Sequence, residues 1–444
     1  MKITRAMPAL LILSLSATSV NAQDLANEVS ELRQLLMTVQ TDYDARISDL
    51  EERLARAERQ SRSAQRDADE AIELAEQTAI DQSAGSSAPN AFNPAIGAIL
   101  VGGYADIDSG WDQIPGFQPA GEIGSGESGF SSGEAEINLN ASVDARYFGN
   151  LTLGIGEVDG SVDVGLEEAW FQTTSLPMGL SVLGGRFFSE AGYLNSFHFH
   201  SDDFTDRPLP YQAFFGGRYT VDGVQARWVA PASLLIEIGG ELNWGGGHPA
   251  TANGNSSPGA WTLFSNIGGD VGDSHSWQFG LAWIRADAME RTADGASEAF
   301  TGDSDLAAVD FVWKWAPGGN PVRQNFKLQG EYFRRSETGL FAGLPYDGDQ
   351  TGWYLQGVWQ FAPTWRTGLR HDVVDADNGP LLAGTGLEDP GRSSSRDSLM
   401  LDWSPSEFSR LRMQYTNDKV LPESDHQWHL QYIMSIGAHG AHQF

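Results

Sequence analysis

The sequence predicts an all-β protein: a transmembrane antiparallel β-barrel of about sixteen strands, preceded by an α-helical coiled coil. Three observations support this fold class. The chain closes on Phe444, at the end of an alternating run over 426–444. It starts with a segment typical of exported proteins. Between the two ends lie short alternating runs broken by Gly, Asp and Pro, which is the period-two pattern of membrane barrels.

Residues 1–22 have the pattern of a secretory signal peptide. Lys2 and Arg5 make its start basic, Ala9–Ala17 is largely apolar, and Ala22 suits cleavage. The segment is too short to span a membrane as a helix, although a retained anchor is the alternative. Later runs do not reach the length of a transmembrane helix. A membrane location therefore requires a closed barrel, because only helices and closed barrels satisfy the backbone in lipid.

Composition excludes several kinds of site. The 444 residues include no Cys and carry a net charge of −31. Disulfides and thiolate metal sites are thereby excluded. The acidity argues against nucleic acid as a partner, since phosphates require Lys and Arg.

Residues 23–80 are predicted to form a periplasmic coiled coil. Leu25, Val29, Leu32 and Leu36 begin a stripe with the three-four spacing of a and d positions. A lone helix would have nothing to bury this stripe against, so we expect self-association. The alternative is a helix that lies on its own barrel. Residues 81–94 form a flexible linker without periodicity, and the barrel follows over 95–444.

The barrel region alternates short turns, often with Pro, and longer polar loops. Alternation is clearest at 322–335, whereas 211–219 and 222–229 are expected to form one interrupted strand. An even strand number places both barrel ends on the periplasmic side of a Gram-negative outer membrane. Phe444 is the expected signal for the barrel assembly machinery, and outer-membrane lipid is the expected surrounding. An ordinary soluble edge strand is the alternative for this terminus.

A barrel of this size is wide enough for an aqueous channel. By parity the lumen receives charged and amide side chains, which indicates water rather than a packed core. These residues are Glu134, Glu136, Asn138, Asn140, Asp144, Arg186, Arg227, Lys314, Lys327, Arg366, Arg370 and Arg412.

The third outer loop, 189–210, is the sharpest local feature. The third loop of diffusion porins folds into the barrel and narrows it. Here it would bring three carboxylates inward, opposite cations of the later strands, and the transverse field would favour polar solutes. The predicted constriction consists of Asp202, Asp203, Asp206, Lys327, Arg366, Arg370 and Arg412.

The same loop suggests a metal site. His198 and His200 share one parity, and Asp202 is next on that face. Two imidazoles and a carboxylate suit Zn²⁺ or a similar cation, so zinc is the cofactor that the pattern suggests. The alternative is that these histidines are neutral polar residues of a loop.

Two resemblances follow. Signal peptide, coiled coil and barrel together resemble trimeric porins with an N-terminal periplasmic coiled coil, which implies a homotrimer. The second is to proteobacterial outer-membrane proteins labelled zinc-regulated TonB-dependent outer membrane receptors. The sequence segments that carry this second resemblance are Asn93-Pro-Ala-Ile96, Ile114-Pro-Gly-Phe117, Gly185-Arg-Phe-Phe188, Gly192-Tyr-Leu-Asn195 and Gly268-Gly-Asp-Val-Gly272. TonB-dependent receptors need a folded plug in a barrel of about 22 strands, and this chain has a coiled coil and linker there.

The sequence favours a porin-like channel for passive or selective uptake of small polar solutes or ions. The alternatives are a zinc-linked uptake receptor and a structural tether that anchors the coiled coil. An enzyme is not expected. His371 beside Asp372 is the only strand pair that suggests nucleophile activation, and by parity the two point to opposite faces.

Overall fold

The computed structural model describes residues 34, 37, 94–118, 123–158, 161–244, 248, 258–293 and 296–437. The predicted signal peptide (1–22), nearly all of the coiled coil (23–80), the linker up to residue 93 and Phe444 lie outside the described residues. The chain divides into two units, and the second, Phe92–Phe444, contains the barrel.

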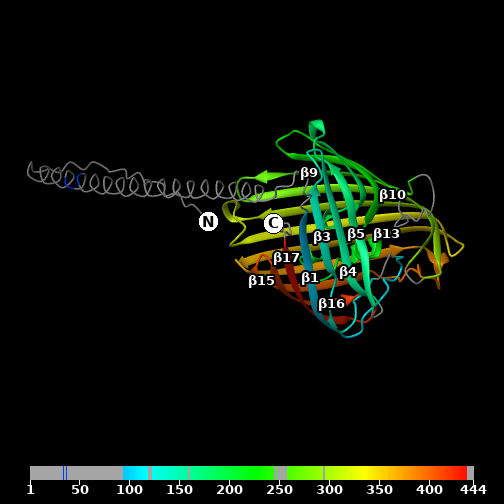
Figure 1. The fold of residues 1–444 in the computed structure, drawn as a ribbon. Helices are drawn as coiled ribbons and strands as arrows, with labels where there is room; N and C mark the ends of the chain where they lie inside the picture. The colour runs from blue at the N-terminus through cyan, green and yellow to red at the C-terminus, as the bar shows by residue number, and fades with distance from the viewer. Residues whose placement is uncertain are drawn as a thin grey trace, which may run out of the picture. The chain divides into compact units, whose positions relative to one another are not determined.

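The strands close into an antiparallel barrel (Figure 1). β1 (Ala95–Ile107) pairs along one edge with β17 (Asp425–Gly437). Its other edge pairs with two successive segments, β3 (Ala135–Ser142) and then β2 (Gly129–Ser131). The seventeen segments therefore occupy sixteen positions, as predicted.

Each remaining strand pairs with its neighbours in chain order. They are β4 (Tyr147–Val158), β5 (Ser161–Thr173), β6 (Leu180–Phe188), β7 (Thr220–Val229), β8 (Leu235–Asn243), β9 (Ala260–Val271), β10 (His275–Thr292), β11 (Ala299–Trp315), β12 (Asn325–Phe341), β13 (Leu344–Ala362), β14 (Trp365–Asp377), β15 (Ser394–Ser406) and β16 (Ser409–Lys419). Short helices are η1 (Pro177–Gly179), η2 (Tyr193–Ser196), η3 (Phe199–Ser201), α2 (Leu209–Phe215), η4 (Pro317–Gly319) and η5 (Pro380–Leu382).

Side chains alternate between a buried inner face and an exposed outer face. In β13 nearly every second residue is buried, because successive side chains of a strand point to opposite faces. The outer face is apolar in many strands. Its large residues, each more than a third exposed, include Leu281, Trp283, Phe311, Tyr332, Trp353, Leu355, Leu399, Met413, Trp428 and Leu430.

The structure corrects two strand predictions. Residues 209–215 form α2, not the first half of an interrupted strand, and β7 begins at Thr220. Gly216, at φ 63°, ends this helix in the left-handed conformation that suits glycine. The alternating sequence over 131–145, which by its pattern predicts one strand, is divided between β2 and β3.

Two residues predicted to face the lumen lie elsewhere. Asp144 is in the turn after β3, where it accepts hydrogen bonds from the backbone N–H of Arg146 and Tyr147. Arg186 faces outward and pairs with Asp222 at 3.0 Å, because Phe187 is the residue that β6 directs into the barrel.

The core of the protein lies inside the barrel. Its largest hydrophobic cluster combines α2, inward residues of the strands and the segment 111–117. The predicted water-filled lumen is thus largely packed among the described residues. The helices described are all too short or too polar to cross a membrane.

Candidate functional site: the third loop and its two attachments

The third loop, residues 189–219 between β6 and β7, lies inside the barrel. Its backbone N–H groups donate to side chains of strands all round the sheet: Glu190 to Glu241 of β8, Leu194 to Glu331 of β12, Leu209 to Asp372 of β14 and Thr205 to Gln414 of β16, at 2.8–3.2 Å. A segment that contacts strands spread over the circumference must occupy the lumen. The predicted inward fold of this loop therefore agrees with the structure.

Asn195 closes the neck of the loop. Its side-chain amide donates to the carbonyl oxygens of Ser189 and Tyr219, at 2.7 and 2.8 Å, and its oxygen accepts from the N–H of Tyr219. All three residues are buried. Buried backbone groups need hydrogen-bond partners. Where β6 and β7 separate, the side-chain amide of Asn195 supplies the hydrogen bonds that strand pairing no longer provides.

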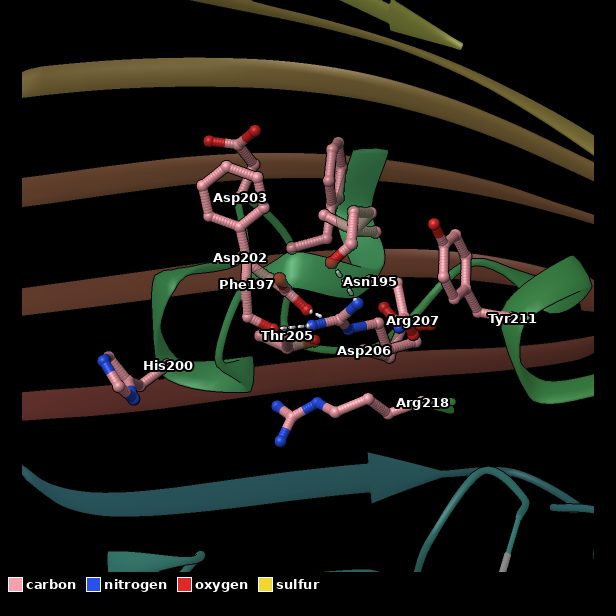
Figure 2. A network of polar contacts seen from close by, with 12 residues as sticks. Asn195, Phe197, His200, Asp202, Asp203, Thr205, Asp206, Arg207, Tyr211 and Arg218 are labelled. Atoms are coloured by element: carbon pink, nitrogen blue, oxygen red, sulfur yellow. Dashed lines mark hydrogen bonds and ion pairs between the residues drawn. The ribbon is translucent and has the colours of Figure 1, made fainter. Parts of the chain in front are cut away.

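Arg207 holds the interior of the loop together (Figure 2). Its Nε lies 2.6 Å from a carboxylate oxygen of Asp202, and its terminal nitrogens donate to the carbonyl oxygens of Leu194 and Phe197. Figure 2 shows the Asp202 side chain directed toward Arg207 and His200 directed away from both. Burial raises the pKa of Asp202, and the charge of Arg207 opposes that rise.

We call the first attachment of the loop the basic side. Asp203 lies 2.5 Å from Lys327 Nζ and 3.2 Å from Arg366 Nη1. Asp206 lies 2.9 Å from Arg370 Nη2 and also pairs with Arg396.

These cations set the protonation of the two aspartates. Burial alone would raise the pKa of Asp203, but Lys327 and Arg366 outweigh it and hold that pKa below its usual range. The pKa of Asp206 is lowered against the same effect by Arg370 and Arg396.

The seven residues of the predicted constriction come together, but in direct contact. Arg412 does not face an aspartate across water. Its guanidinium donates to the carbonyl oxygens of Asp202 and Phe204, and it is fully buried. The basic side is thus a neutralised seam between loop and wall.

We call the second attachment the acidic side. Here His198 and His200 meet glutamates of β3 and β5. The Nδ1 atoms of His198 and His200 lie 3.1 and 3.0 Å from the two carboxylate oxygens of Glu136. His198 Nδ1 is also 3.2 Å from Glu167, and its Nε2 is 3.1 Å from Glu168.

A β-bulge explains why adjacent glutamates reach one imidazole. Thr152 pairs with Glu168, but Leu153 pairs with Leu166, so Glu167 is the extra residue of β5. A bulge redirects side chains that would otherwise point to opposite faces. Parity from the sequence placed Glu136 in the lumen but could not show this bulge, and Glu167 and Glu168 were missed.

Arg218 adds a fixed cation to the acidic side. It lies 3.1 Å from Glu167 and stands between two rings, 4.0 Å from the centre of Phe188 and 3.9 Å from that of Phe199. Burial alone would lower the pKa of His198, but hydrogen bonds to Glu136, Glu167 and Glu168 outweigh burial and raise that pKa well above 6.5.

The metal prediction changes in one ligand. Among the described residues, the cluster with metal-binding geometry is Glu136, His198 and His200, with ligand atoms within 4.8 Å of one another. Asp202 is committed to Arg207 and does not belong to it. Glu136 takes its place because the short helix η3 turns the backbone between His200 and Asp202, so the period-two rule does not hold there.

A cavity of about 1080 Å³ lies between the two sides. The third loop lines it, together with turns at the end of the barrel where β1 begins. Its charged lining is mixed: Glu136, Glu168, Asp202, Asp203, Glu407, Lys314, Lys327, Arg366 and Arg410, with His198 and His200.

The half of the lumen away from the cavity is packed around α2 of the third loop. Phe214 of α2 lies against Phe117 and Phe333, with ring centres 5.6 and 5.9 Å apart. Arg291 and Glu337, both buried, form a pair at 2.7 Å. Predicting this packing would have required recognising α2, whose apolar residues were assigned to a strand.

Comparison with known proteins supports the fold. No family model matches the chain. An uncharacterized protein of Aquifex aeolicus is 29% identical over 339 residues, which cover 71% of this chain and 70% of that protein. The outer membrane channel DcaP of Acinetobacter baumannii is 12% identical, covers 78% of this chain with 97% of its own, and has a TM-score of 0.53. OmpF of Salmonella typhi, in complex with daunomycin, is also 12% identical, with coverages of 77% and 97% and a TM-score of 0.48.

The likeness to DcaP is one of fold. The resemblance to the zinc-regulated TonB-dependent receptors gains no support from these comparisons. His371 and Asp372 are separated as parity predicts: Asp372 is buried in the lumen, whereas His371 is part-exposed and 2.7 Å from Asp397.

Proposed function

We propose that this protein is an outer-membrane channel for small polar solutes or ions, in which the third loop controls passage. The observation that carries the proposal is the cavity of about 1080 Å³ with charged walls inside a barrel whose outer face is apolar. A cavity with charged side chains inside an apolar shell suits a barrel that passes polar solutes through lipid.

The outer surface supports a membrane location. Aromatic rings gather near the turns at one end of the barrel: Trp313 near Phe326 at 5.9 Å, and Trp365 near Trp403 at 6.1 Å. Aromatic girdles of this kind flank the apolar band of membrane barrels. DcaP, which has a similar fold, is an outer membrane channel.

Planar-bilayer conductance of the purified protein tests the proposal. We expect discrete openings of low conductance, because the third loop and the segment 111–117 fill much of the lumen. A variant lacking residues 197–215 should show larger openings. If neither protein conducts, the barrel is closed and the protein is better explained as a structural tether. The packed half of the lumen favours that alternative.

Self-association through residues 23–80 is part of the same proposal. Its support is the apolar stripe that begins at Leu25, which a lone helix could not bury. Deleting 23–80 should lower the mass of the detergent-solubilised particle from trimer toward monomer and leave the barrel inserted. An equal mass before and after deletion would contradict the coiled-coil assembly.

A further inference from the structure

The acidic side has the geometry of a metal site that joins the third loop to the wall. His198 is the N-cap of η3 and His200 lies within it, and both imidazoles contact Glu136 of β3. The two rings lie nearly parallel, at 25° and 5.6 Å between centres. Glu136 of β3 is buried, with one oxygen directed at each Nδ1 atom.

These distances suit replacement of a proton by an ion. The Nδ1-to-oxygen separations of 3.1 and 3.0 Å are those of hydrogen bonds. Ligands around a tetrahedral ion, with bonds of about 2.0–2.2 Å, stand roughly 3.3–3.5 Å from one another. Small rotations of three side chains would therefore give nitrogen and oxygen ligands around one ion, without movement of the backbone.

The surroundings of His198 support the same assignment. Its Nε2 lies 3.1 Å from Glu168, so the nitrogen opposite Nδ1 has a carboxylate acceptor. A metal-binding histidine usually donates its second N–H to such a group, which fixes the ring and the tautomer. Glu167, 3.2 Å from Nδ1, is paired with Arg218 and lies outside the three-residue cluster.

The ligand types select a class of ion. Imidazole nitrogen suits Zn²⁺, Cu²⁺, Ni²⁺ and Co²⁺, whereas Mg²⁺ and Ca²⁺ prefer all-oxygen sites. Three carboxylates meet one arginine and two imidazoles among the described contacts of this cluster, so a divalent cation could replace imidazole protons as the charge that balances the carboxylates.

We propose that Glu136, His198 and His200 bind one divalent transition-metal ion of the zinc class, with Glu168 orienting His198. Such an ion would fasten the third loop to β3 at the edge of the charged cavity. The proposal does not depend on conduction, so a barrel that fails to conduct leaves it standing.

Binding is tested on full-length protein, purified without a histidine tag and stripped with a chelator. Titration with Zn²⁺ by calorimetry, and with Co²⁺ by its visible absorption, should give one site per chain and a spectrum of mixed nitrogen and oxygen ligands. Absence of saturable binding, or a spectrum without nitrogen ligands, would overturn the proposal in the unaltered protein, whatever the variants do.

The variants then assign the site. The double change His198→Ala, His200→Ala should abolish the site, and Glu136→Gln should weaken it. Glu168→Gln should weaken binding by about 10–100-fold, the usual effect of losing an orienting partner. The control is His371→Ala, His426→Ala, which removes two histidines paired outside the cluster, with Asp397 and Tyr415. Equal affinity in the two double variants would show that the metal binds elsewhere.

Discussion

The third loop is held from two sides by attachments of opposite charge. On the basic side, Asp203 and Asp206 meet lysine and arginine, whose charge is present at any physiological pH. On the acidic side, glutamates of the wall meet imidazoles of the loop, whose charge depends on conditions.

The difference separates a permanent attachment from an adjustable one. Arginines of the basic side have second partners in the wall: Arg366 pairs with Asp402, Arg370 with Asp372 and Arg396 with Asp418. These pairs within the barrel wall hold the arginines in place without the loop, and the aspartates of the loop add further ion pairs. The carboxylates of the acidic side have His198 and His200 of the loop as partners. Whatever binds these two histidines therefore determines how the negative charge of the carboxylates is neutralised.

Loss of the basic side should have the largest effect. The double change Asp203→Asn, Asp206→Asn leaves Lys327 without its carboxylate and weakens the seam. We expect a loss of about 3 kcal/mol in unfolding free energy, the lower end for breaking a buried pair, since the arginines keep wall partners. Denaturant unfolding in detergent measures the loss, and single-channel conductance should rise as the loop loosens.

The matched control is Asp349→Asn. Asp349 pairs with Arg334 on the outer face, where both side chains are about half exposed. This change should leave unfolding and conductance as they were, because exposed ion pairs contribute little. If the double variant behaves like this control, the loop is not held by the basic side.

Gly192 tests how tightly the loop enters the lumen. It has a φ of 93°, and a Cβ there would stand 2.4 Å from Glu331 and 2.5 Å from the Tyr211 hydroxyl. Gly217 also has a positive φ, 98°, but its nearest neighbour would be 3.5 Å away. Gly192→Ala should therefore cost about 1–3 kcal/mol more than Gly217→Ala, the usual cost of overpacking.

Protease sensitivity of the loop, together with denaturant unfolding, measures this difference. Both glycines have a positive φ, so alanine is strained at either position, whereas the close contacts with Glu331 and Tyr211 arise only at residue 192. Equal costs would mean that the start of the loop can shift away from β12.

Sequence reasoning predicted the closed barrel well because alternation is a local property. The sixteen positions follow from parity and loop lengths. The inward third loop was inferred from diffusion porins, and its aspartates do contact lysine and arginine of later strands. It failed where backbone geometry departs from period two. The bulge at Glu167, the short helix η3 (Phe199–Ser201) and α2 each redirect side chains without a clear local pattern.

The packed half of the lumen could not be predicted for a related reason. Charged residues on inner faces, Arg412 among them, were interpreted as lining water, but Arg412 is fully buried against backbone carbonyl groups of the third loop. Arg291 is fully buried as well. Glu337, for example, accepts from Arg291, which lies 46 positions earlier in the chain. Such pairing depends on which strands face one another, and single-strand parity does not specify it.

Acid should leave the basic side intact over a wide range. The pKa values of Asp203 and Asp206 lie below the ordinary 3.8, so their contribution to stability is full above that value. It is lost only as pH falls through the lowered pKa values. The facing groups are Lys327, Arg366, Arg410 and Gln356 for Asp203, and Arg370, Arg396, Asp372, Gln414 and His429 for Asp206.

Limited proteolysis of the loop from pH 7 to about pH 4.5, with an acid-tolerant protease, measures this, since carboxylates with lowered pKa values stay ionised there. The loop should stay protected throughout. Release between pH 6 and pH 5 in the unaltered protein, absent from the variant Asp203→Asn, Asp206→Asn, would show that these aspartates take up protons far too early.

The smallest expected loss of stability among the variants concerns Arg218 on the acidic side. Its guanidinium lies 4.0 Å from the ring centre of Phe188, whose ring also meets His198 at 4.9 Å between centres. Phe188→Leu keeps an apolar side chain but removes the ring, and should cost about 0.5–2 kcal/mol of stability. Phe188→Tyr keeps the ring and should restore most of that loss. Phe130→Leu, at a ring that is 91% exposed, controls for the exchange itself.

Denaturant midpoints that fall equally for the Leu and Tyr variants of Phe188 would show that side-chain volume matters here and the cation over the ring does not. A loss confined to the Leu variant would mean that the acidic side also has a fixed element, and that its adjustable part is restricted to the two histidines.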